Sequence, residues 1–270
     1  MSIFDNWFGS RPGPPLQEVS TETLMALGSV RDALANAGEL CSQAMGELSR
    51  VTDTPDLEEP VRATAKQLEK ALVMAMVAAD EAAPKLFGTP PRRVTQELVE
   101  YGRSAASRLA EASRAALAFT SDLLEHSPEL QYQRGVDFAS GRGGWPEDDV
   151  QAVAWFEKAA KQNHPKGQDF LGAMYLLGRG VAQDFNVAFG WFTKSANQGY
   201  ALAQRNLGTM YAEGKGVPPD PVTACMWLDL AARGGALDAG RLLSEVRANL
   251  SASDVEEAKR RADSWQPSHL

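Results

Sequence analysis

The chain has 270 residues, 44% of them hydrophobic and 23% charged, a composition that excludes a wholly disordered protein. Its formal net charge of -8 argues against nucleic-acid binding, which needs a basic surface. Two distant cysteines and no apolar run near the roughly 20 residues of a membrane-spanning helix predict a cytoplasmic protein without disulfides or a transmembrane segment.

Residues 1–16 are predicted to form a flexible N-terminal tail. Ile3, Phe4, Trp7 and Phe8 would share one face of a helical turn, and a stretch rich in glycine and proline follows them. These four residues either fold onto the neighbouring helices, or form a short docking motif for a partner or an interfacial anchor. No basic residue lies among them, which weakens the membrane alternative.

Residues 17–126 are predicted to form an Ala-rich bundle of about three long helices. Proline-containing breaks separate segments at about 17–51, 57–83 and 92–125. Apolar residues recur in each segment at a spacing typical of helices packed in a bundle or a coiled coil. The similar lengths and short connections favour an up-down-up arrangement, and such a bundle could tether the protein or make it self-associate.

The third segment is similar to the core helix of phasins, which are Ala-rich helical proteins that coat polyester storage granules. Leu98, Val99 and Tyr101 carry the resemblance, within an amphipathic pattern over about residues 92–125. The resemblance implies an alternative function. In that alternative the chain binds the surface of a granule or a membrane, and its C-terminal half recruits other proteins.

Residues 127–250 contain an internal repeat. Trp155, Trp191 and Trp227 are 36 residues apart, and further positions recur with the same step or with one extra residue in the first unit. These positions are Asp148, Asp184 and Asp220; Ala152, Ala188 and Ala224; Gly135, Gly172 and Gly208; Phe138, Tyr175 and Tyr211; and Gly141, Gly178 and Gly214.

Each unit is predicted to be a helix, a Gly-rich loop and a second helix. Gly178 and Gly214 are expected to end first helices in the left-handed conformation. The aspartates, such as Asp184, are expected to cap the second helices. Gly172 and Gly208 fall inside first helices, where a small residue allows a neighbouring helix to approach closely. The three tryptophans are expected in the core.

This pattern strongly resembles the Sel1-like repeat family, whose members are helix-pair solenoids akin to tetratricopeptide repeats. The resemblance covers about residues 130–240 and is closest in the second and third units. The first unit departs from the pattern at Arg134, Phe138 and Gly144. Terminal repeats of a solenoid are often atypical, so these departures are compatible with a first repeat. The resemblance implies an all-α C-terminal solenoid of three repeats.

The end of the chain is predicted to cap this solenoid. A fourth first-type helix is expected at about 238–249, but its Gly-rich loop is missing. Residues 251–270 are then predicted to form a capping helix and tail, with Ser251 or Ser253 as the N-cap. Apolar positions that include Ala258 and Ala262 would cover the last repeat.

No catalytic, cofactor or metal site is expected. His126, His164 and His269 have no helical partner four residues away. The Gly-x-Gly-Val loops at 178–181 and 214–217 follow helices rather than strands, so they do not fit dinucleotide binding. The sequence therefore predicts a protein that is not an enzyme.

A binding surface is predicted on the concave side, which the first helices line in helix-pair solenoids. Positions two before, one after and four or five after the motif glycine would point there, and by analogy with tetratricopeptide geometry the position three before it is taken as the less buried alternative to two before. The candidate residues are Tyr132, Val136, Asp169, Ala173, Leu177, Arg205, Thr209 and Glu213. Their mixed acidic, basic and apolar character favours a protein or peptide segment as the partner. The alternative is that the protein's own N-terminal bundle fills this groove.

The sequence thus predicts an interaction adaptor or scaffold. Members of the resembling family commonly act as adaptors, and the resemblance implies that class. The solenoid would bind a partner segment, and residues 17–126 would tether or oligomerise the protein. The alternative is the phasin-like granule protein described above.

Overall fold

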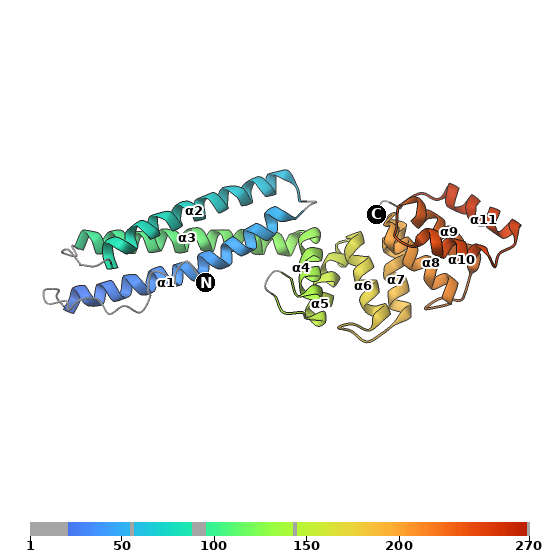
Figure 1. Cartoon of the computed structure of the whole chain (residues 1–270), viewed down its shortest axis with the longest axis horizontal. Helices are drawn as coiled ribbons and strands as arrows, with labels where there is room; N and C mark the ends of the chain where they lie inside the picture. Colours follow the sequence, from blue (N-terminus) through green and yellow to red (C-terminus); the bar gives the residue numbers. More distant parts are fainter. Residues whose placement is uncertain (1–20, 55–56, 88–95, 143–144, 269–270) are drawn as a thin grey trace. The chain divides into compact units, whose positions relative to one another are not determined.

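The computed structural model describes residues 21–54, 57–87, 96–142 and 145–268, and these residues form eleven helices and no strand (Figure 1). The predicted all-α class is therefore confirmed. The chain divides into two compact units, Met1–Glu125 and His126–Leu270, here called the N-terminal unit and the repeat unit. Within the described residues, no helix combines the length and the hydropathy that a membrane span requires.

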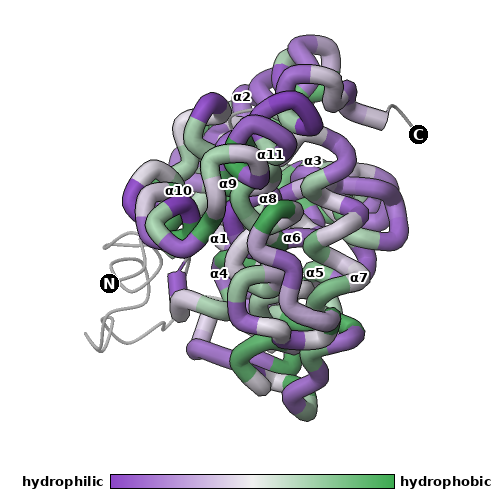
Figure 2. The backbone as a smooth tube through the Cα atoms, turned by 90° about the vertical axis from the view of Figure 1, so that its right-hand side faces the viewer, coloured by the Kyte–Doolittle hydropathy of each residue, from purple (hydrophilic) through white to green (hydrophobic). Residues whose placement is uncertain are grey.

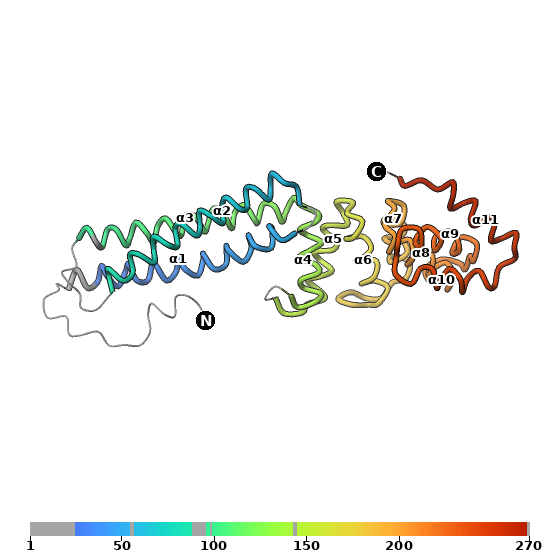
Figure 3. Tube along the Cα trace, turned by 45° about the horizontal axis from the view of Figure 1, so that its top comes forward, coloured from blue at the N-terminus to red at the C-terminus, as the bar shows by residue number. Residues whose placement is uncertain are grey.

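The N-terminal unit consists of three long helices: α1 (Thr21–Asp53), α2 (Glu59–Phe87) and α3 (Gln96–His126). They lie side by side in both Figure 1 and Figure 3. Leu34, Leu72 and Leu109, one from each helix, are fully buried between them. Three amphipathic helices bury their apolar stripes in this way, as the sequence predicts.

Helix α2 continues beyond the end that the sequence predicts. Pro84 was expected to begin a break, but it lies inside the helix, which ends at Phe87. A proline removes one backbone hydrogen bond and usually kinks or ends a helix. Here the last turn is held by tertiary packing, because Leu86 is buried against Gly102 of α3.

The repeat unit is a row of helix pairs followed by two capping helices. Its helices are α4 (Pro128–Ser140), α5 (Asp149–Lys161), α6 (Pro165–Leu177), α7 (Phe185–Asn197), α8 (Ala201–Glu213), α9 (Pro221–Arg233), α10 (Ala239–Arg247) and α11 (Ala252–Ser264). The helices α4 with α5, α6 with α7 and α8 with α9 form the pairs, and each pair also packs against the next.

The helix ends follow the predicted local chemistry. Asp184 accepts hydrogen bonds from the backbone N–H groups of Asn186 and Val187 at the start of α7, and Asp148 and Asp220 do the same for α5 and α9. The glycines after α4, α6 and α8 adopt the left-handed conformation. The repeating aspartates and glycines therefore fix where each helix begins and ends.

The motif glycines inside the first helices are sites of close helix packing. A Cβ atom built on Gly172 would lie 2.9 Å from the ring of Phe192, and Gly135 and Gly208 meet Phe156 and Leu228 in the same way. Each contact joins the two helices of one pair. The predicted close approach is confirmed.

The prediction that all three tryptophans are core residues is wrong for two of them. Trp155 and Trp191 are half-buried, and the ammonium groups of Lys158 and Lys194 lie about 4 Å above their rings. The next residue along each helix occupies the core instead, because successive residues point about 100° apart. Trp227 alone is buried, with Trp265 of the C-terminal cap packed edge-on against it.

The second glycine of each loop joins neighbouring repeats. Gly180 lies against the backbone carbonyl of Asp149, and Gly216 lies against that of Phe185, so a Cβ atom at either position would overlap the earlier repeat. Both glycines also have positive φ angles, +67° and +70°. Arg179 reinforces the first contact with an ion pair to Asp149 at 2.7 Å.

The predicted C-terminal cap is present. Helices α10 and α11 both pack against α9, and Leu243 and Ala258 join a small core with Cys225 and Leu228. Ser251, one of the two predicted candidates, caps α11. Much of α11 is hydrophilic in Figure 2, as expected of a helix that covers the end of a solenoid.

Candidate functional site

The first helices of the pairs lie on the inner side of the repeat stack. Helix α4 contacts α6 and α8 contacts α10, and a hydrogen bond from Asn206 to Asp169 joins α8 to α6, whereas no close approach joins α5 to α7 or α7 to α9 in the described part of the unit. Helices that lie closer together line the inner side of a curved solenoid. We call the side formed by α4, α6 and α8 the first-helix surface.

The predicted partner-binding residues lie on this surface with different exposure. Leu177 is 62% exposed. Glu213 is also exposed, and its carboxylate lies 2.8 Å from the ammonium of Lys215. The remaining candidates other than Asp169 are partly buried, namely Tyr132, Val136, Ala173, Arg205 and Thr209.

The structure corrects the expectation for Asp169. Its side chain was expected to be an exposed acid, but the residue is only 5% exposed. Its Oδ1 atom accepts a hydrogen bond of 2.8 Å from Nδ2 of Asn206 on α8. Burial, partly offset by Asn206 and the charge of Arg205, raises the pKa of Asp169 to about 6.

Asn206 connects Asp169 to Arg205. The Nη2 atom of Arg205 donates to Oδ1 of Asn206 at 2.9 Å, while its Nη1 atom donates to the carbonyl oxygen of Leu237 at 3.4 Å. The repeat pattern does not predict Asn206 as a member of the site. The available signal was a polar amide at a position where the second repeat has Phe170.

Burial and nearby charges, including that of Asp169, raise the pKa values of two tyrosines, Tyr132 and Tyr200. Burial raises the pKa of Tyr132 to about 12, and the charges of Glu129 and Asp169 act in the same direction. Burial also raises the pKa of Tyr200 to about 12, and the charges of Asp169 and Tyr132 act in the same direction. Neither phenol hydroxyl has a hydrogen-bond partner in the described part of the chain. The repeat pattern does not predict Tyr200 as a member of the site.

The ring of Tyr132 is held in place by its neighbours. It packs edge-on against Phe170, with ring centroids 5.3 Å apart, and lies tilted against His164 at 5.4 Å. Nδ1 of His164 accepts the N–H of Gly167, so the ring proton is on Nε2 and is donated to Glu129 at 2.8 Å. The position of Tyr132 therefore depends on packing and on a histidine with a defined tautomer.

These residues form one group on the first-helix surface, here called the tyrosine–aspartate cluster. It consists of Tyr132, Asp169, Tyr200, Arg205 and Asn206. Its members come from α4, α6 and α8 and from the residue that precedes α8. The cluster brings together hydrogen-bonding groups of three repeats on the first-helix surface, and Leu177 lies about two turns further along α6.

We expect Asp169→Asn to stabilise the repeat unit at neutral pH. The folded-state pKa is raised, so the folded state retains a proton between about pH 4 and 6 that the unfolded state has lost. Stability therefore falls as the pH rises through this window. The raised pKa corresponds to about 3 kcal/mol. Urea unfolding should show a higher free energy of unfolding for Asp169→Asn than for the wild type at pH 8 but not at pH 4. An equal increase at both pH values would contradict this expectation.

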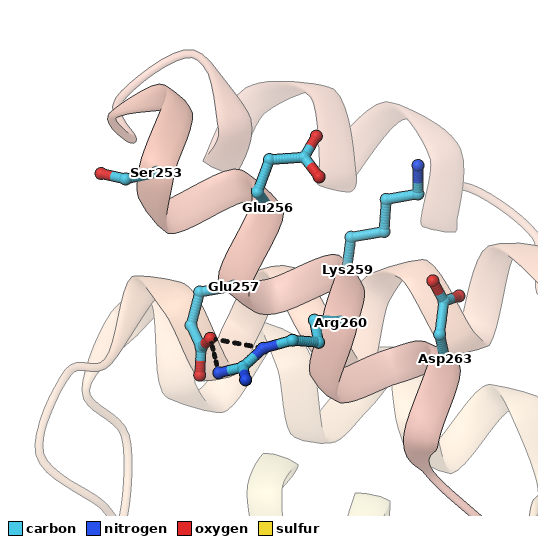
Figure 4. A pocket seen from close by; sticks show the side chains of 6 residues that line it. All are labelled: Ser253, Glu256, Glu257, Lys259, Arg260 and Asp263. Atoms are coloured by element: carbon cyan, nitrogen blue, oxygen red, sulfur yellow. Dashed lines mark hydrogen bonds and ion pairs between the residues drawn. The ribbon is translucent and has the colours of Figure 1, made fainter.

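A hollow of about 630 Å³ lies along α11, and its lining residues are drawn in Figure 4. All of them belong to this one helix, and Glu257 forms ion pairs with Arg260 and Arg261. The hollow is the outer, charged face of a capping helix. It lacks the converging groups from several elements that a ligand site requires.

The remaining predicted residues, Ile3, Phe4, Trp7 and Phe8, lie outside the described residues. In the part of the chain that the structure describes, no three His, Cys, Asp or Glu side chains are arranged to hold a metal ion.

Comparisons with known proteins agree with the repeat architecture. The Sel1 repeat family matches residues 128–164, 165–200 and 201–235. Among solved structures, a Sel1 repeat protein from Oxalobacter formigenes is 32% identical, with 49% of this chain and 98% of that chain covered and a TM-score of 0.44. A protective antigen present in uropathogenic Escherichia coli strains, which displays an SLR fold, is 20% identical, with 76% and 55% covered and a TM-score of 0.44. The chain thus spans about half of that antigen's length.

No curated protein matches the chain. The three matched segments coincide with the three helix pairs α4–α5, α6–α7 and α8–α9. The chain belongs to the Sel1 repeat family through residues 128–235.

Proposed function

We propose that the protein is a non-enzymatic adaptor that binds a segment of another protein along the first-helix surface. Sel1 repeat proteins are generally protein-interaction scaffolds. The observation that carries the proposal is the exposed side chain of Leu177 on the same first-helix surface as the tyrosine–aspartate cluster. Apolar, tyrosine and arginine side chains on one surface are typical of protein interfaces.

The chemistry of this surface favours binding over catalysis. A nucleophile would need a base within hydrogen-bond reach. The two tyrosine pKa values of about 12 keep the hydroxyls protonated at neutral pH. These groups can donate and accept hydrogen bonds to a peptide without being consumed. We expect the protein to act in the cytoplasm.

Affinity capture with the full-length chain from its source cells tests this proposal. Leu177→Asp and Arg205→Glu are expected to reduce recovery of a partner by about tenfold or more, because they place charge or reverse it at the binding surface. Val150→Asp on α5 is the matched control, since Val150 is 64% exposed and lies outside the surface. Equal recovery by all four proteins would contradict the proposed surface.

For the N-terminal unit we propose self-association through α2. Val73, Met74 and Val77 are exposed on this helix and form an apolar patch. Exposed apolar patches commonly mark interaction sites. The full chain is expected to sediment as an oligomer, and Met74→Glu is expected to shift it to the monomer. Ser29→Glu, an exposed change of equal charge on α1, should have no effect; a monomeric wild-type protein would contradict this role.

The same patch supports the second candidate function, association with polyester granules. Of the residues that carry the resemblance to phasins, Val99 is buried and Tyr101 is exposed. Granule binding predicts that the full chain partitions onto polyester particles and that Met74→Glu prevents this. Failure to partition under conditions where the protein still self-associates would exclude this candidate.

A further inference from the structure

The carboxylate of Asp169 is largely buried and accepts one hydrogen bond, although its two oxygens can accept about four. Asn206 donates to Oδ1, and the described residues supply no partner for Oδ2. The side chain of Arg205 does not pair with it directly, because its donors go to Asn206 and to the carbonyl of Leu237. Oδ2 is not a fully buried atom, so a donor from a bound partner can reach it and replace water there.

We infer that Asp169 receives a lysine or arginine side chain of the bound protein segment. The inference rests on the proposed function and names the chemistry of the partner at that same surface. The first-helix surface would then select segments with a basic residue at the position that faces the second repeat.

The two tyrosines complete a site that suits a cationic donor. The hydroxyls of Tyr132 and Tyr200 come from different repeats, lie within reach of the charge on Asp169, and have no partner in the described chain. An ammonium group has three N–H donors and no acceptor, so it suits a site that offers carboxylate and phenol oxygens. The ring of Tyr132 already lies 5.8 Å from the ammonium of Lys166, so cation–π attraction operates at this site.

An anionic partner group fits this site less well. It would have to approach the charged carboxylate of Asp169 from its unpaired side. Lys166, the nearest ammonium on α6, lies 3.6 Å from Glu129 on α4 and is therefore already opposed by a carboxylate. Charge complementarity at Asp169 thus favours a basic side chain.

A purely structural role for Asp169 does not explain its charge. An asparagine at this position could accept the same hydrogen bond from Asn206 without the cost of a buried carboxylate. The residue therefore holds a charge that destabilises the fold at neutral pH, which is typical of binding sites. This comparison also provides the test, since Asp169→Asn keeps the shape and removes the charge.

The experiment uses immobilised full-length protein and pools of nine-residue peptides. The central residue of each pool is fixed as lysine, arginine, leucine or glutamate, and the other positions are randomised. The wild type is expected to retain the lysine and arginine pools about tenfold more than the leucine pool, as a charge-assisted hydrogen bond implies. Asp169→Asn should abolish this preference, and Glu157→Gln on α5 should preserve it, because Glu157 pairs with Lys161 outside the surface.

The pH dependence gives a second readout. The charged and titratable groups that interact with Asp169 are Arg205, Tyr132 and Tyr200, and the two tyrosines in turn interact with Glu129 on α4 and Lys166 on α6. Protonation of Asp169, whose pKa is about 6, should reduce the basic preference of the wild type between pH 7 and pH 5. Asp169→Asn should show no such change.

The outcomes separate this inference from the proposed function. If the wild type retains all pools equally, or prefers the glutamate pool, the inference is wrong while peptide binding stands. If Asp169→Asn keeps the basic preference, the inference is also wrong. If the wild type retains no pool above the level of Leu177→Asp, both the inference and the proposed surface fail.

Discussion

Gly216→Ala is expected to destabilise the repeat unit by about 3 kcal/mol or more. Two effects act together at this position. The residue has a φ angle of +70°, which costs a non-glycine residue about 1–2 kcal/mol. The new Cβ atom would also overlap the carbonyl group of Phe185, so the second and third repeats would have to separate. Gly180→Ala should act alike between the first and second repeats.

Gly235→Ala is the matched control for this substitution. Gly235 has a φ angle of +76°, but a Cβ atom there would meet nothing within 4 Å, so only the backbone cost of about 1 kcal/mol remains. Denaturant unfolding can be followed by tryptophan fluorescence, since all tryptophans except Trp7 lie in residues 127–270. Equal losses for Gly216→Ala and Gly235→Ala would show that the loop contact contributes nothing.

Phe192→Ala is expected to cost about 3–5 kcal/mol, the range for removing a buried phenylalanine ring. Phe192 is fully buried in the core formed by α7, α8 and Trp227, and its ring packs against Gly172. The neighbouring change Trp191→Ala should cost less, about 1–2 kcal/mol, because the indole is half-buried and one side faces Lys194.

The order of these two losses tests the correction to the predicted core. The same fluorescence-monitored unfolding can rank Phe192→Ala and Trp191→Ala, with Phe192→Leu as a milder control that keeps most of the apolar volume. If Trp191→Ala lowers the free energy of unfolding more than Phe192→Ala does, the tryptophan is the principal core residue and the structure is contradicted.

Much of the fold could be predicted because the repeats display their local chemistry in register. Asp184 before a helix and Gly178 after one have roles that depend on only a few neighbouring residues. Recurrence over three units turns each weak local signal into a specific one. The same reasoning located the capping helix and narrowed its N-cap to Ser251 or Ser253.

The sequence pattern could not decide which of two adjacent aromatic residues is buried in the core. Trp191 and Phe192 are both apolar and neighbours in one helix, and which of them points inward depends on the rotation of α7 against the next repeat. Likewise, the contact of Gly180 with Asp149 joins residues of two repeats. The orientation of α7 and the contact of Gly180 both depend on how the repeats stack. The spacing of residues in the sequence does not determine that stacking.

The candidate site was predicted in outline and corrected in detail. The helix face and Leu177 follow from counting positions around the motif glycine. The burial of Asp169 and the roles of Asn206 and Tyr200 do not, because each depends on side chains from a neighbouring repeat. The resulting cluster couples adjacent repeats, so a bound segment that spans it would contact all three.

Site-specific photo-crosslinking in the source cells tests the central claim most directly. A photoreactive residue is placed at Leu177 on the first-helix surface or at Val150 outside it, both of which are more than 60% exposed. The account predicts a covalent adduct with another protein from position 177 and none from position 150. An adduct from position 150 alone, or from neither position, would contradict binding along α4, α6 and α8.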